Sequence, residues 1–451
     1  MVKEKRGRFT AIRQIFAVVF FCPVVLTQGA YAQKAASDSL LSEVTLRSAI
    51  SYALKNQPAI QQAALDEQIT ESQIRSKLSD WYPHANFGFG LQHNFELPVS
   101  FINGNAIPAG VNNTSAAQFS ASQILFNRDV LLARRTKGNV ILQSKQQTEN
   151  DKINLVVNIT KAFYDVLTTA QQIKVAEENI RRTERSLKDA TAQYKAGIAD
   201  KTDYKRATIS LNNIKATKRS NEELEKAKLE YLKSLMNYPE SGTLNMVYDS
   251  LEMEREIFLD TLQKPDYRAR VEYRILETQQ NLLKANLAYT RWGYLPSVSA
   301  NGGYNFNFQN NNFAKLYGAN YPNSFAGITL ALPIFQGGKR KADMRTAELQ
   351  LSRNDLDMIS LRNTVNTQYS TALAGYQSSL ENYLALKQNV ALAQEVYAVI
   401  QLQYRSGIKS YLEVITAETD LRTAQINYFN ALYSVLVNKV DVQRALGQIV
   451  Y

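Results

Sequence analysis

Few residues in this chain of 451 could carry out catalysis. Its two histidines, His84 and His93, have no second metal ligand at a suitable spacing, and the single cysteine, Cys22, lies in an N-terminal leader. The remaining chain therefore has no disulfide, thiolate metal site or cysteine nucleophile. It also lacks a P-loop, a nucleophile elbow and a metal-binding motif. We predict that the chain is not an enzyme and uses no metal and no cofactor.

One sequence pattern occurs twice in the chain, at an offset of 210 residues. The two copies read QYKAGIADKTDY at 193–204 and QYRSGIKSYLEV at 403–414. In each copy a glycine ends a long helical pattern and a polar residue begins the next, which is typical of a helical hairpin tip. Two matching tips indicate an internal duplication. The residues that superimpose are Tyr194 and Tyr404, Gly197 and Gly407, and Ile198 and Ile408.

Residues 1–32 have the pattern of a secretory signal peptide. A basic start is followed by the apolar run from Ile15 to Leu26 and by an A-x-A cleavage site at 30–32. An uncleaved anchor is the alternative, but a run of about 12 residues is short for a span of about 20. Lipidation at Cys22 is disfavoured because Phe20 and Phe21 precede it.

Net charge gives little support for nucleic acid binding. The total is +11, and five basic residues and one acidic residue lie in the leader, which leaves +7 for residues 33–451. No five basic residues are consecutive, so we interpret the excess as a solvated surface.

Four segments alternate in polarity and are predicted strands. Phe87, Phe89 and Leu91 face one way, while glycine and glutamine face the other. Polar stretches at 99–114 and 309–323 are predicted loops. The strands are expected at about 86–97, 115–126, 297–308 and 324–335.

Long helical patterns follow each pair of strands. The segments 128–193 and 339–404 lack internal proline and predict helices on the order of 100 Å long. Apolar and aromatic residues recur every seven positions, which indicates coiled-coil packing. We favour packing over a ligand-stacking ladder for these aromatics. Shorter helices are predicted at 45–80 with a break at Pro58, 202–237, 266–292 and 411–446, and a mixed connector at 239–265.

These pieces predict an α+β membrane protein. Strands with one apolar face and one polar face are typical of outer-membrane barrels, but a barrel needs about eight strands and the chain supplies four. Three copies would give twelve strands, and two or four are arithmetically possible. The alternative is a soluble β-domain capping a helical bundle, which explains neither the long loops nor the signal peptide.

The ordered motifs resemble the TolC-like outer-membrane efflux protein family across essentially the whole chain after the leader. The matching features are the two tips, LPIFQGG at 332–338, the start at Pro265-Asp266-Tyr267-Arg268, and TLRSAISYALKNQP near the N-terminus. The resemblance implies a homotrimer with a twelve-stranded outer-membrane β-barrel and a coiled-coil α-helical periplasmic tunnel. The repeats would be 33–265, with its tip at about 194–203, and 266–451, with its tip at about 404–413.

The resemblance also implies roles at the tips. A periplasmic gate would involve Thr202 and Asp203 of the first tip, and Tyr404 and Lys409 of the second. The family often has arginine where Lys409 stands. Lysine keeps the positive charge but cannot form arginine's paired hydrogen bonds, so we expect a weaker contact between the tips.

An acidic ring of the family maps to Glu413. Its second position falls on Thr416, with Glu418 as a possible supplement. The solvated alternative remains open for each of these polar residues. Adaptor docking would use Gly197, Ile198, Gly407 and Ile408, where an exposed isoleucine suits a partner better than water.

We therefore predict a passive duct of a tripartite efflux or type I secretion system, located in the cell outer membrane with its helices in the periplasm. Its partners would be further copies of itself, outer-membrane lipid, a periplasmic adaptor and an inner-membrane transporter. The alternative is a periplasmic coiled-coil structural or adaptor protein. An adaptor would show one hairpin between β-domains, whereas this sequence has two hairpins and alternating strands.

Overall fold

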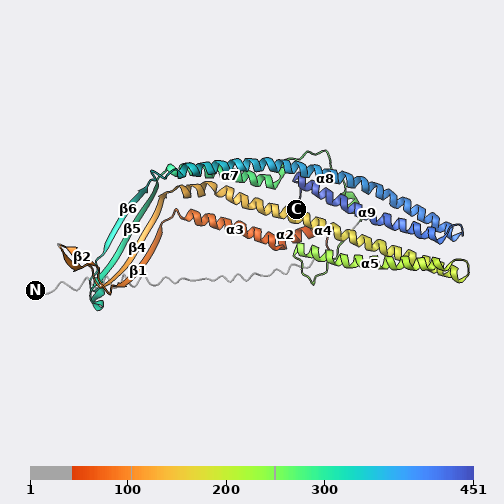
Figure 1. Cartoon of the computed structure of the whole chain (residues 1–451), viewed down its shortest axis with the longest axis horizontal. Coiled ribbons are helices and arrows are strands. Elements are labelled where there is room, and N and C mark those ends of the chain that lie inside the picture. The colour runs from red at the N-terminus through yellow and green to blue at the C-terminus, as the bar shows by residue number, and fades with distance from the viewer. Residues whose placement is uncertain (1–42, 103, 248–249) are drawn as a thin grey trace. The chain divides into compact units, whose positions relative to one another are not determined.

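The computed structural model describes residues 43–102, 104–247 and 250–451 (Figure 1). The predicted signal peptide, residues 1–32, lies outside the described residues. None of the helices in the described ranges is long and apolar enough to cross a membrane.

Two very long helices form the frame of the fold. Helix α4 spans Arg128–Lys195 and helix α8 spans Lys339–Arg405, with 68 and 67 residues. At a rise of 1.5 Å per residue, each is about 100 Å long. Each begins just after a strand and ends at a hairpin tip, so the tips lie at the far ends of the helices from the sheet (Figure 1).

Shorter helices pack along the two long ones. Helices α3 (Pro58–Ser79) and α5 (Lys201–Met236) contact α4, and helices α7 (Val271–Arg291) and α9 (Tyr411–Leu446) contact α8. The short helices of the first half meet end to end, because the Gln57 side chain donates to the Leu235 carbonyl at 2.9 Å. The sequence predicted this arrangement of two short helices beside each long one.

The remaining helical pieces are short. Helix α2 (Leu46–Asn56) stops before α3, where Pro58 begins a new helix because it lacks an N–H to continue the old one. The connector between the halves contains α6 (Ser250–Glu256). Short 3-10 helices occur at Tyr267–Ala269, Trp292–Tyr294 and Phe313–Gly318.

Four strands form one antiparallel sheet in the order β1-β4-β5-β6. The outer strands of the sheet, β1 and β6, each pair on one side only. The strands span His84–His93 (β1), Asn113–Phe126 (β4), Ser297–Asn310 (β5) and Asn323–Ala331 (β6).

The strand register places aromatic residues on one face of the sheet. Phe87 pairs with Phe119, which pairs with Tyr304, and their side chains share a face. On the opposite face Gln118 pairs with Asn305. Phe325 is an exception on the polar face, where its ring covers Gly303 so closely that an added Cβ would lie 2.8 Å from a ring carbon.

The structure differs from the predicted strands and loops in several places. The stretch 99–114 was predicted as a loop but contains a second hairpin, β2 (Val99–Ile102) paired with β3 (Asn105–Pro108). Gly104 has φ +81°, the left-handed conformation that a tight turn needs. Strand β1 ends four residues before the predicted 97. Strand β6 ends at Ala331 rather than near 335, because Pro333 has no N–H for the ladder.

The heptad tyrosines of α8 pack between helices, as predicted. Tyr376, Tyr383 and Tyr397 are each 8% exposed or less. The Tyr383 ring lies 5.6 Å from the ring of Tyr428 on α9. The seven-residue seam is therefore a packing seam and not an open ladder.

Candidate functional site

The first hairpin tip joins α4 to α5 through a left-handed glycine. Gly197 has φ +75°, and the Ile198 N–H donates to the Gln193 carbonyl at 2.9 Å. This is the glycine helix ending that the sequence indicated. Asp200 then caps α5 by accepting a 2.7 Å hydrogen bond from the Thr202 N–H. Thr202 therefore supplies a backbone N–H to the cap.

The second tip repeats this geometry with a different cap. Gly407 has φ +76°, and the Ile408 N–H donates to the Gln403 carbonyl at 2.9 Å. Ser410 and Glu413 then form a capping box at the start of α9, in which the Ser410 N–H donates to Glu413 at 2.9 Å.

Lys409 and Glu413 are paired within the second tip. The Lys409 ammonium lies 2.7 Å from a Glu413 carboxylate oxygen. This bond, together with the Ser410 N–H, lowers the pKa of Glu413. In one copy of the chain, both predicted gate residues are thus engaged with their own hairpin.

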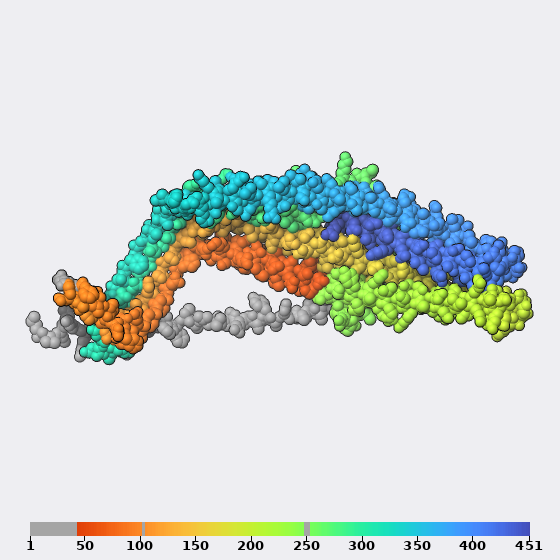
Figure 2. Space-filling model, viewed as in Figure 1, coloured from red at the N-terminus to blue at the C-terminus, as the bar shows by residue number. Residues whose placement is uncertain are grey.

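Tyr404 connects the two tips. Its hydroxyl donates to the side-chain oxygen of Gln193 on α4 at 2.7 Å. Figure 2 shows the two hairpin ends, yellow-green and blue, next to each other. The sequence did not predict a role for Gln193. The signal that was available is the Gln-Tyr pair in both tips, which makes Gln193 equivalent to Gln403.

Asp203 lies on the first tip near this connection. Partial burial, together with the charge of Asp200, raises the pKa of Asp203, while Arg206 opposes the shift. Burial and the Asp203 charge in turn raise the pKa of Tyr404. The charge of Asp203 on the first tip therefore acts on Tyr404 of the second.

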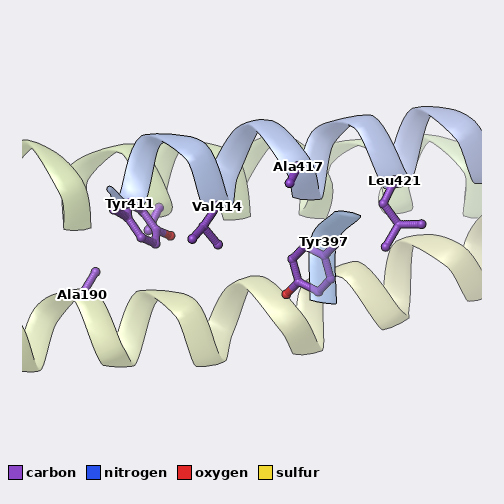
Figure 3. Packing of buried hydrophobic residues seen from close by; sticks show 7 residues of the cluster. Ala190, Tyr397, Tyr411, Val414, Ala417 and Leu421 are labelled. Carbon is purple, nitrogen blue, oxygen red and sulfur yellow. The ribbon is translucent and has the colours of Figure 1, made fainter. Parts of the chain in front are cut away.

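An apolar cluster lies behind the tips and packs the hairpins together. Ala190 of α4 faces Tyr411 and Val414 of α9, and Tyr397 of α8 lies between the helices (Figure 3). Tyr411 is 1% exposed. Small alanines on α4 and α5 permit the close approach of the tyrosine rings.

Glu418 is buried at the same boundary between the hairpins. It is 3% exposed and accepts a short hydrogen bond from the Thr183 hydroxyl of α4. Burial raises the pKa of Glu418, against the opposing effects of Thr183, Arg182 and Arg422. The sequence suggested that Glu418 supplements an exposed acidic ring, but in the structure its carboxylate lies between helices.

Further polar contacts continue along α4 and α9 away from the tips. Gln172 donates to Asn430 at 2.7 Å, and Lys161 lies 2.6 Å from Asp441. Arg182 bonds more weakly to Gln425, at 3.4 Å. The boundary between the two hairpins therefore combines the apolar cluster near the tips with single polar contacts further along α4 and α9.

The tip isoleucines are strongly exposed. Ile198 is 78% exposed and Ile408 is 71% exposed. Both follow a glycine that the turn requires, but the turn itself does not require an apolar residue next to it. The isoleucines thus add two exposed apolar side chains to the tips, where Leu402 and Leu412 are also exposed.

The described residues hold no group of three or more histidine, cysteine, aspartate or glutamate side chains that could bind a metal ion. His93 instead contacts the side-chain oxygen of Asn113 through Nδ1 at 2.6 Å.

The fold thus joins two paired long hairpins to one four-stranded antiparallel sheet. Residues 49–237 and 274–448 match the sequence model of the outer membrane efflux protein family, and the chain belongs to that family.

Individual relatives are distant but cover nearly the whole chain. The outer membrane protein TolC of Escherichia coli K12 is 22% identical over 91% of this chain and 83% of its own length. The cation efflux system protein CusC of the same strain is 23% identical, covering 89% and 86%. The open-state structure of the MtrE outer membrane channel of Neisseria gonorrhoeae shares the fold, with a TM-score of 0.71 at 18% identity over 89% and 88%.

The chain is accordingly an outer-membrane efflux duct, and the resemblance seen in the sequence is confirmed. The alternative of a periplasmic structural or adaptor protein is not favoured.

Proposed function

We propose that three copies of this chain form one channel, with a twelve-stranded barrel continued by a helical periplasmic tunnel, and that residues 33–265 and 266–451 are its two repeats. The observation that supports this best is the sheet, which has two unpaired edges and two chemically different faces. Unpaired strand edges are not tolerated in hydrocarbon. A sheet of this kind needs further copies at β1 and β6.

Strand direction allows copies to join without a break. The four strands alternate in direction, so β6 of one copy would run antiparallel to β1 of the next. Two copies reach the lower limit of about eight strands, and three give twelve. Similarity to the efflux family favours three.

The proposed path for cargo runs along the polar faces. The asparagine- and serine-rich face of the sheet would line the barrel, and the aromatic face would contact lipid. The chain would act as a passive conduit, opened when a periplasmic adaptor and an inner-membrane pump dock. The exposed Ile198 and Ile408 support docking at the tips, together with Gly197 and Gly407, which fix the turns.

The proposed gate is the boundary between the hairpins near the tips. In one copy Tyr404 bonds to Gln193 across this boundary and feels the charge of Asp203, and Thr202, at the start of α5, would act from the first tip. Lys409 and Glu413 would act from the second tip, where three copies would bring three such pairs around one axis. Opening would separate the α8–α9 hairpin from α4.

Two adjacent residues of β6 provide the test. Ile328 lies on the aromatic face, opposite Ala300, and Thr329 lies on the polar face, opposite Ser299. A lysine facing lipid at mid-depth costs about 2–4 kcal/mol, whereas lumen positions tolerate charge. We expect Ile328→Lys to reduce the yield of a three-copy, heat-modifiable species in outer-membrane fractions, and Thr329→Lys to preserve it. Recovery of the unaltered chain only as a soluble monomer would contradict the proposal.

A further inference from the structure

The joints between the helices and the sheet carry a concentrated positive charge. We define the collar as residues 75–83, 128–137, 286–296 and 339–345, where α3, α4, α7 and α8 meet the strands (Figure 1). These segments hold eleven basic and three acidic residues, a net charge of +8. Residues 33–451 as a whole carry +7. The rest of that chain is therefore close to neutral, and its positive excess lies in the collar.

The collar segments of α4, α7 and α8 contact each other through cation–aromatic pairs. The Arg128 guanidinium lies 4.5 Å from the centre of the Tyr289 ring, joining α4 to α7. The Arg340 guanidinium lies 4.5 Å from the Tyr294 ring, joining α8 to the end of α7. At 4.5 Å both are cation–π contacts, which leave the positive charge in place.

Most of the collar charge has no carboxylate partner. Arg134, Lys137, Arg291 and Lys341 are exposed, and none forms an ion pair within the described part of the chain. Asp129, the one acidic residue of its segment, accepts a 2.5 Å hydrogen bond from the Tyr289 hydroxyl. Several collar cations are thus exposed in the single chain and have no carboxylate partner among the described residues.

Aromatic residues accompany these cations on the side of the strands. The chain has two tryptophans, Trp81 and Trp292, and both lie in the collar, at the equivalent helix-to-strand joints of the two halves. Tyr82 is 67% exposed, and Phe335, which precedes α8, is 87% exposed. Tryptophan and tyrosine collect where hydrocarbon gives way to head groups, and basic side chains near that level attract anionic lipid.

We propose that the collar binds the phosphate-bearing head groups of anionic phospholipid in the membrane leaflet from which the helices emerge. This proposal rests on the membrane position of the sheet given under the proposed function. The exposed aromatic residues mark the edge of the hydrocarbon, and the cations one to two helical turns further on reach the phosphates. Charge complementarity selects anionic over zwitterionic lipid, and salt weakens the contact.

Lipid counting on the intact assembly tests the collar. The full chain would be purified in mild detergent, mixed with phosphatidylglycerol or phosphatidylcholine, and examined by native mass spectrometry. A collar variant would carry Arg134→Gln, Arg135→Gln and Lys341→Gln. A matched variant would carry Lys145→Gln, Lys152→Gln and Arg353→Gln, which remove the same charge from the same two helices outside the collar.

We expect the unaltered chain and the matched variant to retain phosphatidylglycerol in preference to phosphatidylcholine. In the collar variant, the ratio of bound phosphatidylglycerol to bound phosphatidylcholine should fall at least about fivefold. A variant with Arg134→Lys, Arg135→Lys and Lys341→Arg keeps the three charges and should retain the preference for phosphatidylglycerol. If the collar variant is still trimeric and binds phosphatidylglycerol as before, lipid binding by the collar is overturned, but the proposed function is not. If the unaltered chain is a water-soluble monomer, both the membrane position of the sheet and lipid binding by the collar are overturned.

Discussion

The Tyr404 hydroxyl of α8 donates a 2.7 Å hydrogen bond to Gln193 of α4. This bond joins the last turns of the two long helices, next to the two hairpin tips. A neutral hydrogen bond of this kind contributes about 0.5–1.5 kcal/mol. It can hold two tips together at rest and still yield to a partner that binds them. In the proposed gate, a small energy at the tips would therefore decide between the closed and the open state.

Loss of the Tyr404 hydroxyl should favour separation of the tips. Tyr404→Phe keeps the ring beside Tyr411 and removes only the bond to Gln193. A loss of about 1 kcal/mol corresponds to roughly a fivefold shift toward the open state per copy. Single-channel recording in planar bilayers would measure it as longer open times. Tyr369→Phe is the control, because it removes a tyrosine hydroxyl bond on the same helix far from the tip. Equal effects of the two variants would contradict a gating role for Tyr404.

The buried Glu418 should make the contact between the hairpins depend on pH. Its pKa is raised when the hairpins are packed and returns to an ordinary value near 4.3 when it meets water. The packed state therefore binds more protons, and its stability falls as pH rises from the ordinary value through the raised one. Channel opening should increase with pH in that window.

Substitutions distinguish the contribution of Glu418 to the pH dependence from those of the other acidic residues near the tips. The pKa of Asp203 is also raised, so Glu418→Gln should reduce the pH slope and Glu418→Gln with Asp203→Asn should abolish it. Glu413 has a lowered pKa, but its partners Lys409 and Ser410 belong to the same hairpin and stay with it on opening. A double variant with the unaltered pH slope would contradict this assignment.

Most of the fold was predictable from the sequence, because heptad repeats and glycine turns are local signals. The ends of α4 and α8 fell within about two residues of the predictions. The contacts between the hairpins were not predictable, since Gln193 and Thr183 carry no local mark that they face α8 or α9. Glu418 was misplaced for the same reason. A carboxylate on a helix is usually exposed, and only the packing of α9 against α4 buries it.

The exposed tip isoleucines should matter for export and not for assembly. Ile198→Asp or Ile408→Asp places a charge on an exposed turn, where the folded state tolerates it, but it would be costly inside an apolar partner interface. Export by cells should fall strongly while the amount of assembled protein stays unchanged. Ile198→Val, which keeps an apolar side chain, is the control. Loss of assembled protein in the aspartate variants would show that these residues support the fold of the tip instead.

Conductance with the tips locked and unlocked tests the central claim most directly. In a chain with Cys22→Ser, Gln193→Cys and Tyr404→Cys would be joined by a cleavable bifunctional maleimide that spans the two positions. A duct gated by separation of its hairpins predicts low conductance in planar bilayers while the linker is intact, and a several-fold increase once it is cleaved. Equal conductance before and after cleavage would contradict the gate. Correctly inserted protein that passes no ions in either state would contradict the duct itself.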